Sequence, residues 1–194
     1  RPNREGSTAA AGRLKEAELQ RNLGIAALGV ATFVALPVAA AEDKTIPVSV
    51  ENFARAESDL YFNNVVNEGG FGQFTHRREP SDIDNQTVIR LNRDTLYSSA
   101  IFDLEAGPVT ITMPDAGDRF MSLMILNEDH YVPMVHYGAG PVTLDKETVG
   151  TRYVVAAVRT VVNPSDEEDL KAVHALQDAI KVERQAAAVS KFLT

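Results

Sequence analysis

The chain has 194 residues, 27 acidic against 19 basic side chains and no cysteine. The missing cysteines exclude disulfides, zinc–thiolate sites and thiol nucleophiles. The net charge of −8 disfavours partners such as nucleic acid or an anionic membrane surface, because both select for basic patches.

The first 41 residues differ from the rest of the chain. Residues 1–20 are small, polar and mixed in charge, and we expect them to be disordered or to lie upstream of the true start. Residues 21–41 resemble a secretory signal peptide: Arg21 precedes an uncharged run, and three alanines end it, with cleavage expected after Ala41. The alternative is a membrane anchor, since residues 22–41 approach the length of a bilayer span. The alanine ending and Pro37 favour cleavage, which predicts a periplasmic or secreted protein without a stable membrane anchor.

The mature chain is expected to begin with a helix over residues 49–70. Ser49 is placed to cap its N-terminus, and Gly69 and Gly70 are placed to end it. Apolar residues at steps of three and four predict a stripe that faces the core: Val50, Phe53, Ala54, Leu60, Tyr61 and Val65. Residues 71–85 then lack any period and predict a long loop.

The apolar period changes to two after Asn85, which indicates strands. Residues 109–113 alternate and predict a half-buried strand near an edge, whereas residues 120–126 and 153–162 are apolar on both faces and predict central strands. Short turns between successive strands predict antiparallel pairing. The segment from Asp166 onward predicts a C-terminal helix that docks through Leu170, Val173, Leu176, Ile180 and Val182.

These elements predict a single α+β domain over residues 42–194. Its expected architecture is an antiparallel, β-rich sandwich or a strongly twisted sheet, flanked by an N-terminal and a C-terminal helix.

Three strings carry a family resemblance: "IRLNRDTLYSSAIFDL", "VTITMPDAGDRFMSL" and "ALQDAIKVE". With them the chain resembles the bacterial domain-of-unknown-function family numbered 1254, over about residues 47–185. The resemblance implies an exported, β-rich domain with no assigned activity. Many members of that family carry a second domain, numbered 1214, and this chain is too short to hold one. The resemblance therefore implies either a short standalone form or a second domain on a separate protein.

The first candidate site lies in the "NRDTLYS" string. Arg93 could clamp a carboxylate or phosphate with its planar fork, while Asp94 and Tyr97 orient the ligand. We predict ligand binding through Asn92, Arg93, Asp94, Tyr97 and Tyr131. The alternative is a brace, in which Arg93 pairs with a buried carboxylate and Asp94 accepts turn hydrogen bonds.

The second candidate site is the "NEDHYVPMVHY" segment, which we expect to be a polar loop. His130 with Asp129 or Asp94 could form the acid–base pair of a hydrolase. His76, His130 and His136 are the possible ligands of a metal, but their spacing matches no dedicated motif. No metal site and no other cofactor are therefore predicted.

Together these features predict an exported domain that binds a small molecule or an envelope partner through polar residues at strand ends. A hydrolase and a structural or assembly module are the alternatives, and whether the chain is an enzyme stays open.

Overall fold

The computed structural model describes residues 45–84 and 91–184. Backbone contacts group Ile46–Thr194 into one compact unit, separate from Arg1–Thr45. The disordered segment predicted for residues 1–20 and the signal peptide predicted for residues 21–41 lie outside the described residues, so both remain predictions. Within the described ranges, no helix has both the length and the hydropathy needed to cross a bilayer.

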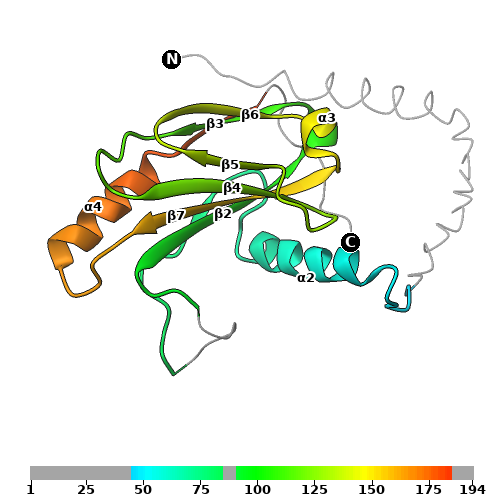
Figure 1. Cartoon of the computed structure of the whole chain (residues 1–194), viewed down its shortest axis with the longest axis horizontal. Helices are drawn as coiled ribbons and strands as arrows, with labels where there is room; N and C mark the ends of the chain where they lie inside the picture. Colours follow the sequence, from blue (N-terminus) through cyan, green and yellow to red (C-terminus); the bar gives the residue numbers. More distant parts are fainter. Residues whose placement is uncertain (1–44, 85–90, 185–194) are drawn as a thin grey trace, which may run out of the picture. The chain divides into compact units, whose positions relative to one another are not determined.

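The described strands form two antiparallel sheets. The large sheet has the order β1-β2-β7-β4-β5 and the small sheet has the order β6-β3-β8. The strands are β1 (Thr75–His76), β2 (Thr95–Asp103), β3 (Val109–Met113), β4 (Met121–Asn127), β5 (Met134–Tyr137), β6 (Gly140–Leu144), β7 (Tyr153–Val161) and β8 (Lys181–Arg184). The helices are α2 (Phe53–Asn67), η1 (Leu104–Ala106), α3 (Lys146–Val149) and α4 (Glu167–Asp178). Figure 1 shows the small sheet stacked on one side of the large sheet and α2 on the other.

The main core lies between the two sheets. Ile111 of the small sheet packs with Leu123 and Val154 of the large sheet, and all three are fully buried. Along β3 every second residue is buried, as expected for a strand with one covered face. This sandwich with two flanking helices confirms the predicted α+β, β-rich antiparallel fold.

The helices cover different parts of the large sheet. Phe62 of α2 packs on Ile101 and Val155, on the face opposite the small sheet. Val173 of α4 packs with Leu96 and Val162, beside the first residues of β2. The chain leaving α2 runs onto β2 at Gly70, where a Cβ atom would lie only 2.6 Å from the Val65 side chain of the helix and 3.3 Å from the Ser99 carbonyl oxygen of β2. Glycine therefore allows this close approach.

The start of α2 and its buried face differ from the sequence prediction. The helix begins at Phe53, with Asn52 rather than Ser49 at its N-cap. The Asn52 side chain accepts from the Ser49 N–H and donates to the Pro47 carbonyl, so it does not cap the helix. Of the predicted apolar stripe, Val65 packs against the core, but the rest is wrong: Val50 is 93% exposed and Phe53 57% exposed. The buried positions of α2 are Ser58 and Phe62, and Val65 and Val66 are partly buried against the core.

Three predictions about the strands are also corrected. β3 is the central strand of the small sheet rather than a strand near an edge. The 114–120 turn leads the chain from the small to the large sheet, so β3 and β4 do not pair. The C-terminal helix ends at Asp178, and Lys181–Arg184 form β8 beside β3. Ile180 and Val182 consequently pack against the core between the sheets rather than on a helix face.

Candidate functional site

Arg93 and Asp94 form a bend immediately before β2, and Asn92 precedes this bend. The Asp94 carbonyl accepts a hydrogen bond from the Val162 N–H at 2.9 Å, while both the Arg93 and Asp94 residues are exposed. Arg93 forms no ion pair with any described residue. The brace that was the alternative for Arg93 is therefore absent from the described part of the chain.

Other arginines pair with the buried carboxylates. Arg152 donates two hydrogen bonds to Asp103, at 3.0 and 2.8 Å. Arg55 of α2 donates to Glu128, whose side chain is only 8% exposed and which also accepts from the Tyr153 N–H. These pairs fix the end of the large sheet that is remote from Asp94.

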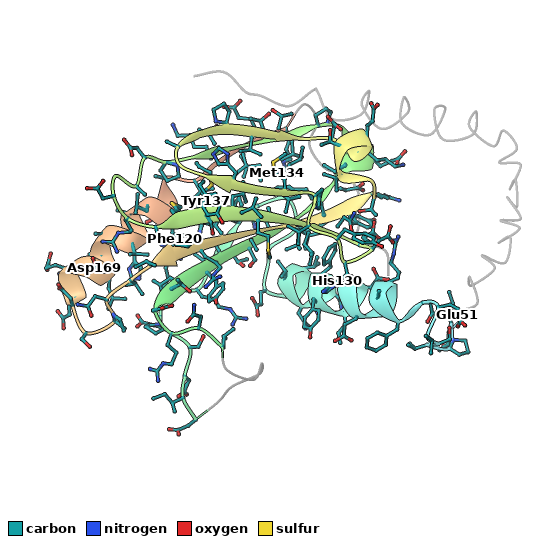
Figure 2. All side chains as sticks on the ribbon, viewed as in Figure 1. Glu51, Phe120, His130, Met134, Tyr137 and Asp169 are labelled. Carbon is teal, nitrogen blue, oxygen red and sulfur yellow. The ribbon has the colours of Figure 1, made fainter. Side chains whose placement is uncertain are left out.

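The β4–β5 loop holds α2 against the sheet. Asp129 accepts a hydrogen bond from Arg55 at 2.7 Å, and His130 Nδ1 lies 3.0 Å from the Ser58 hydroxyl oxygen. Figure 2 labels His130 next to α2. Because Ser58 is fully buried, its hydroxyl is not accessible as a nucleophile. The cluster works as a clamp between a helix and a loop.

Asp94 and His130 are not brought together. Asn127, which hydrogen-bonds to His130, pairs with Val154 at one end of β7, and Asp94 contacts Val162 beyond the other end. The intervening strand separates them by roughly 25 Å. Tyr131 is 72% exposed in the same loop as His130, far from Tyr97. The hydrolase pair with Asp94 thus has no geometric support, and the pair with Asp129 stays a prediction.

The histidines named as possible metal ligands lie apart. His76 sits in β1 and His136 in β5, at opposite edges of the large sheet. His76 Nδ1 lies 2.8 Å from the Ser98 hydroxyl oxygen. Burial lowers the pKa of His76, and the neighbouring Arg78 guanidinium lowers it further. No three His, Asp or Glu side chains of the described residues are arranged to hold a metal ion.

A cavity with a volume of about 610 Å³ lies between α2 and the first strands of the large sheet. We call it the α2 pocket. Tyr97 is the one sequence-predicted site residue that lines it. The residues around it come from three segments: Tyr61, Asn64, Val65, Asn67 and Glu68 of the helix; Thr75 and Arg77; and Leu91, Tyr97 and Ser99.

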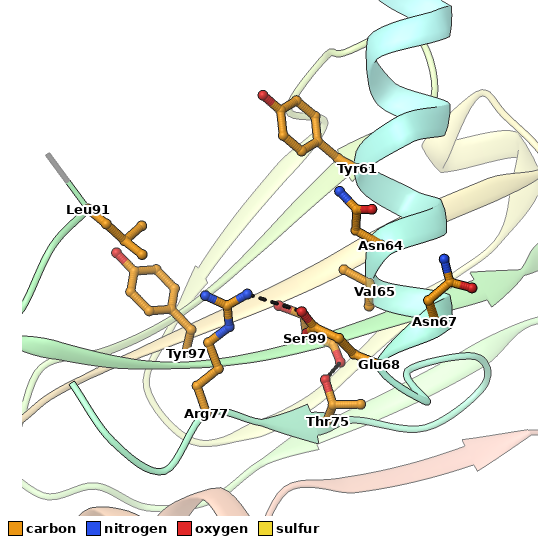
Figure 3. A pocket seen from close by; sticks show the side chains of 10 residues that line it. All are labelled: Tyr61, Asn64, Val65, Asn67, Glu68, Thr75, Arg77, Leu91, Tyr97 and Ser99. Atoms are coloured by element: carbon orange, nitrogen blue, oxygen red, sulfur yellow. Dashed lines mark hydrogen bonds and ion pairs between the residues drawn. The ribbon is translucent and has the colours of Figure 1, made fainter. Parts of the chain in front are cut away.

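The polar groups of the α2 pocket are mostly open to a ligand. Figure 3 shows Tyr61 and Asn64 projecting from α2 and Tyr97 rising from β2 on the facing side. Arg77 pairs with Glu68 at 3.2 Å and is half exposed. Asn64 and Asn67 are exposed, and their amides form no hydrogen bond with the described residues. The pocket therefore offers free amides, tyrosine rings and one ion pair.

The floor of the pocket is braced from α4. Gln177 is fully buried and donates to the Arg77 and Tyr97 carbonyls, at 3.1 and 3.4 Å. Arg78 donates to Gln177 and to Asp178, at 3.1 and 2.5 Å. These contacts fix the segment that carries Arg77, and they involve the "ALQD" string that the family resemblance had singled out.

Most pocket residues were missed from the sequence. The sequence contains one pattern that could have identified them. Three residues at positions i, i+3 and i+7 share one helix face: Tyr61, Asn64 and Glu68. That face was interpreted as apolar because of Leu60 and Val65. Arg77 lies in a loop without a period, where sequence pattern carries no positional information.

Comparisons with known proteins bear on the family and the fold. Residues 71–143 match the family DUF1254, described as a protein of unknown function. The expected family resemblance is confirmed over these residues. The DUF1254 match includes β1, β2 and the pocket residues Thr75, Arg77 and Tyr97, whereas α2 precedes it and β7 follows it.

A solved structure supports the fold. The chain is similar to the crystal structure of the VPA0106 protein from Vibrio parahaemolyticus, with a TM-score of 0.53 and 15% identity. The match covers 73% of this chain and 39% of that one, so the chain spans well under half of the length of this neighbour. A search of curated proteins finds no match. At this identity the likeness concerns the β-rich fold alone.

Proposed function

We propose that this DUF1254 domain binds a small polar ligand in the α2 pocket. The observation that carries the proposal is a concave site of about 610 Å³ with free amide groups and two tyrosine rings. Its volume falls in the range of small-molecule sites, which combine an apolar lining with a few convergent polar groups. Asn64 and Asn67 both donate and accept hydrogen bonds, so they suit a ligand with hydroxyl or amide groups.

The tyrosines give the ligand its contact area. Tyr61 and Tyr97 present apolar rings with a hydroxyl at the tip, a combination that binds amphipathic molecules at small cost in side-chain entropy. The Arg77–Glu68 pair adds one positive and one negative group at the rim. A monosaccharide, an N-acetylated sugar or a zwitterionic amino acid matches this set of groups.

A thermal-shift screen tests the proposal. The probes are glucose, galactose, N-acetylglucosamine and the common amino acids, each added to the full chain. A probe present at one hundred times its dissociation constant stabilises the fold by about 2.7 kcal/mol, which is a measurable rise in Tm.

Two asparagines provide a matched pair for that screen. Asn64→Ala removes an amide from the pocket and should abolish the rise in Tm. Asn63→Ala, one residue earlier on another face of α2, should leave it intact. Equal responses of the two variants, or no response of the wild type to any probe, would refute the assignment of this pocket.

We also propose that the protein is exported and that it has a partner protein. The apolar run and the alanines of residues 21–41 support secretion to the periplasm or the medium. A domain that binds a soluble nutrient-sized molecule suits that compartment. A second-domain protein acting in trans remains a prediction from the family resemblance, with no observation of its own.

A further inference from the structure

Four side chains form a row across the large sheet, outside the α2 pocket. The strand register pairs Tyr97 of β2 with Arg159 of β7, Arg159 with Ser122 of β4, and Ser122 with Tyr137 of β5. Directly paired residues share one face of a sheet, so all four side chains lie on the same face. We call this set the Arg159 row.

The Arg159 row lies on the same face of the large sheet as α2, nearer the start of β2 than the residues that the helix covers. Tyr97 is four residues from Ile101, and side chains at even spacing point to the same side. Ile101 is covered by Phe62 of α2, whereas Tyr137 is 65% exposed. The β5 end of the row is thus exposed, Tyr97 and Arg159 are partly exposed, and Ser122 between Arg159 and Tyr137 is buried.

Arg159 has no anionic partner in the described part of the chain. Its guanidinium lies over the Tyr97 ring, 5.7 Å from the centroid. Its Nε–H is buried and forms no hydrogen bond, and none of the described carboxylates pairs with it. Arginines 55, 119 and 152, by contrast, each bind a carboxylate. A buried donor without a partner lowers the stability of the fold, and a ligand that accepts hydrogen bonds from the same guanidinium would explain its presence here.

The surroundings of Arg159 define the kind of ligand. Apolar side chains lie along both sides of the row, with Met124 and Val135 one rung away and Phe120 beside Tyr137 at a ring-centroid distance of 6.1 Å. The arginine fork matches the two oxygens of a carboxylate, and the stacked tyrosine holds the fork in place. Apolar neighbours would cover the hydrocarbon part of such an acid.

We propose that the Arg159 row is a second binding site, which takes a carboxylate attached to an apolar body. Arg159 receives the carboxylate through the two terminal N–H groups of its guanidinium, and the apolar body lies on the sheet face beside Met124 or Phe120. The proposal does not rest on the α2 pocket, since it uses a different set of groups and shares only Tyr97 with it.

NMR of the arginine side chains tests this proposal directly. The probes are benzoate, hexanoate, acetate and inorganic phosphate, titrated into the ¹⁵N-labelled full chain. Benzoate and hexanoate should shift the Arg159 Nε–H signal in a saturable way, and they should bind at least tenfold more tightly than acetate. Saturation by phosphate alone, or equal affinity for hexanoate and acetate, would overturn a site for apolar acids.

Variants separate the Arg159 row from general charge effects. Arg159→Gln should weaken benzoate binding at least tenfold, whereas Lys181→Gln, which removes an exposed positive charge from the small sheet, should leave it unchanged. Arg159→Lys keeps the charge without the fork, so it should also bind weakly, and it serves as the test if the Gln variant does not fold. Undiminished binding by a folded Arg159→Gln or by Arg159→Lys would refute the site. Asn64→Ala should not affect benzoate binding. A negative result for the Arg159 row is therefore distinguishable from a negative result for the α2 pocket.

Discussion

Arg119 and Arg159 have different roles, and the groups that each one contacts indicate these roles. Arg119 bridges the start of β4 to α4: it donates to the Val161 carbonyl at 2.7 Å and to both oxygens of Asp169. This contact lowers the pKa of Asp169 to about 2, because the guanidinium stabilises the charged carboxylate. Arg159 has only a tyrosine ring as its partner among the described residues. The first arginine is structural, and the second is available to a ligand.

Methionine replacements distinguish these two roles. Arg159→Met keeps the length of the side chain and removes an unpaired donor, so the free energy of unfolding should change by less than about 0.5 kcal/mol or rise. Arg119→Met leaves Asp169 without its cation and should lower Tm clearly. Urea unfolding of both variants checks this expectation. A large loss for Arg159→Met with none for Arg119→Met would reverse the assignment.

His76 predicts how stability depends on pH. Its pKa in the folded protein is lowered, mainly by burial and also by Arg78, with Asp178 acting in the opposite direction. The unfolded chain therefore takes up a proton first as the pH falls below about 6.5, which favours unfolding. The stabilising contribution of neutral His76 is present above this pH and is lost below it.

The His76→Gln variant should show a shallower loss of Tm than the wild type between pH 7.5 and 5. Thermal melts across this range measure the effect. Identical slopes for the two proteins would show that His76 does not cause the dependence.

At the scale of elements, strands were predictable because their pattern is local. The alternation in β3 and the apolar runs of β4 and β7 identify those strands without any knowledge of their neighbours. The sheet to which each strand belongs was not predictable. β2 pairs with β7, which follows it by some fifty residues, whereas the successive strands β3 and β4 belong to different sheets. Tyr97 could be proposed as a site residue from its strand, but its partner Arg159 comes from that distant strand.

The last strand shows how tertiary context overrides a local pattern. "IKVER" continues an apolar helical spacing, yet β3 needs a second neighbour and the core needs Ile180 and Val182. Val182→Asp would place a charge against the core between the sheets and should cost at least about 2 kcal/mol.

Glu183 provides the control on the same strand. It is exposed, and its neighbour Val182 points to the other face, so Glu183→Lys should change stability by less than about 0.5 kcal/mol. Denaturant titrations of the two variants test whether β8 exists in solution. Similar small effects for both would favour a continued helix or a loose end instead.

At the scale of the whole molecule, the comparisons with known proteins support the fold and assign no function. The sandwich agrees with a neighbour of 15% identity, although the chain spans only 39% of that neighbour's length. The DUF1254 match covers residues 71–143 and carries no activity with it. The features of this chain that we propose to bind a ligand are the α2 pocket and the Arg159 row.

Export is the prediction that belongs to the whole chain. In a bacterial host, the full chain should appear in the periplasm or medium in a form shortened by about 41 residues. Replacing Ala39 and Ala41 by bulky residues should leave an uncleaved product in the membrane fraction. Retention of the wild type in the cytoplasm at full length would contradict the signal peptide. Mass spectrometry of the fractions distinguishes these outcomes.

One measurement addresses the central claim, that the α2 pocket is the ligand site. Backbone ¹H–¹⁵N spectra of the full chain are recorded with the sugars and amino acids of the thermal screen. The account predicts that a binding probe shifts amide signals of Asn64, Glu68, Tyr97 and Ser99, which come from α2 and β2, the two elements that face each other across this pocket. Shifts concentrated at His130 and Tyr131, with none at the pocket, would contradict it.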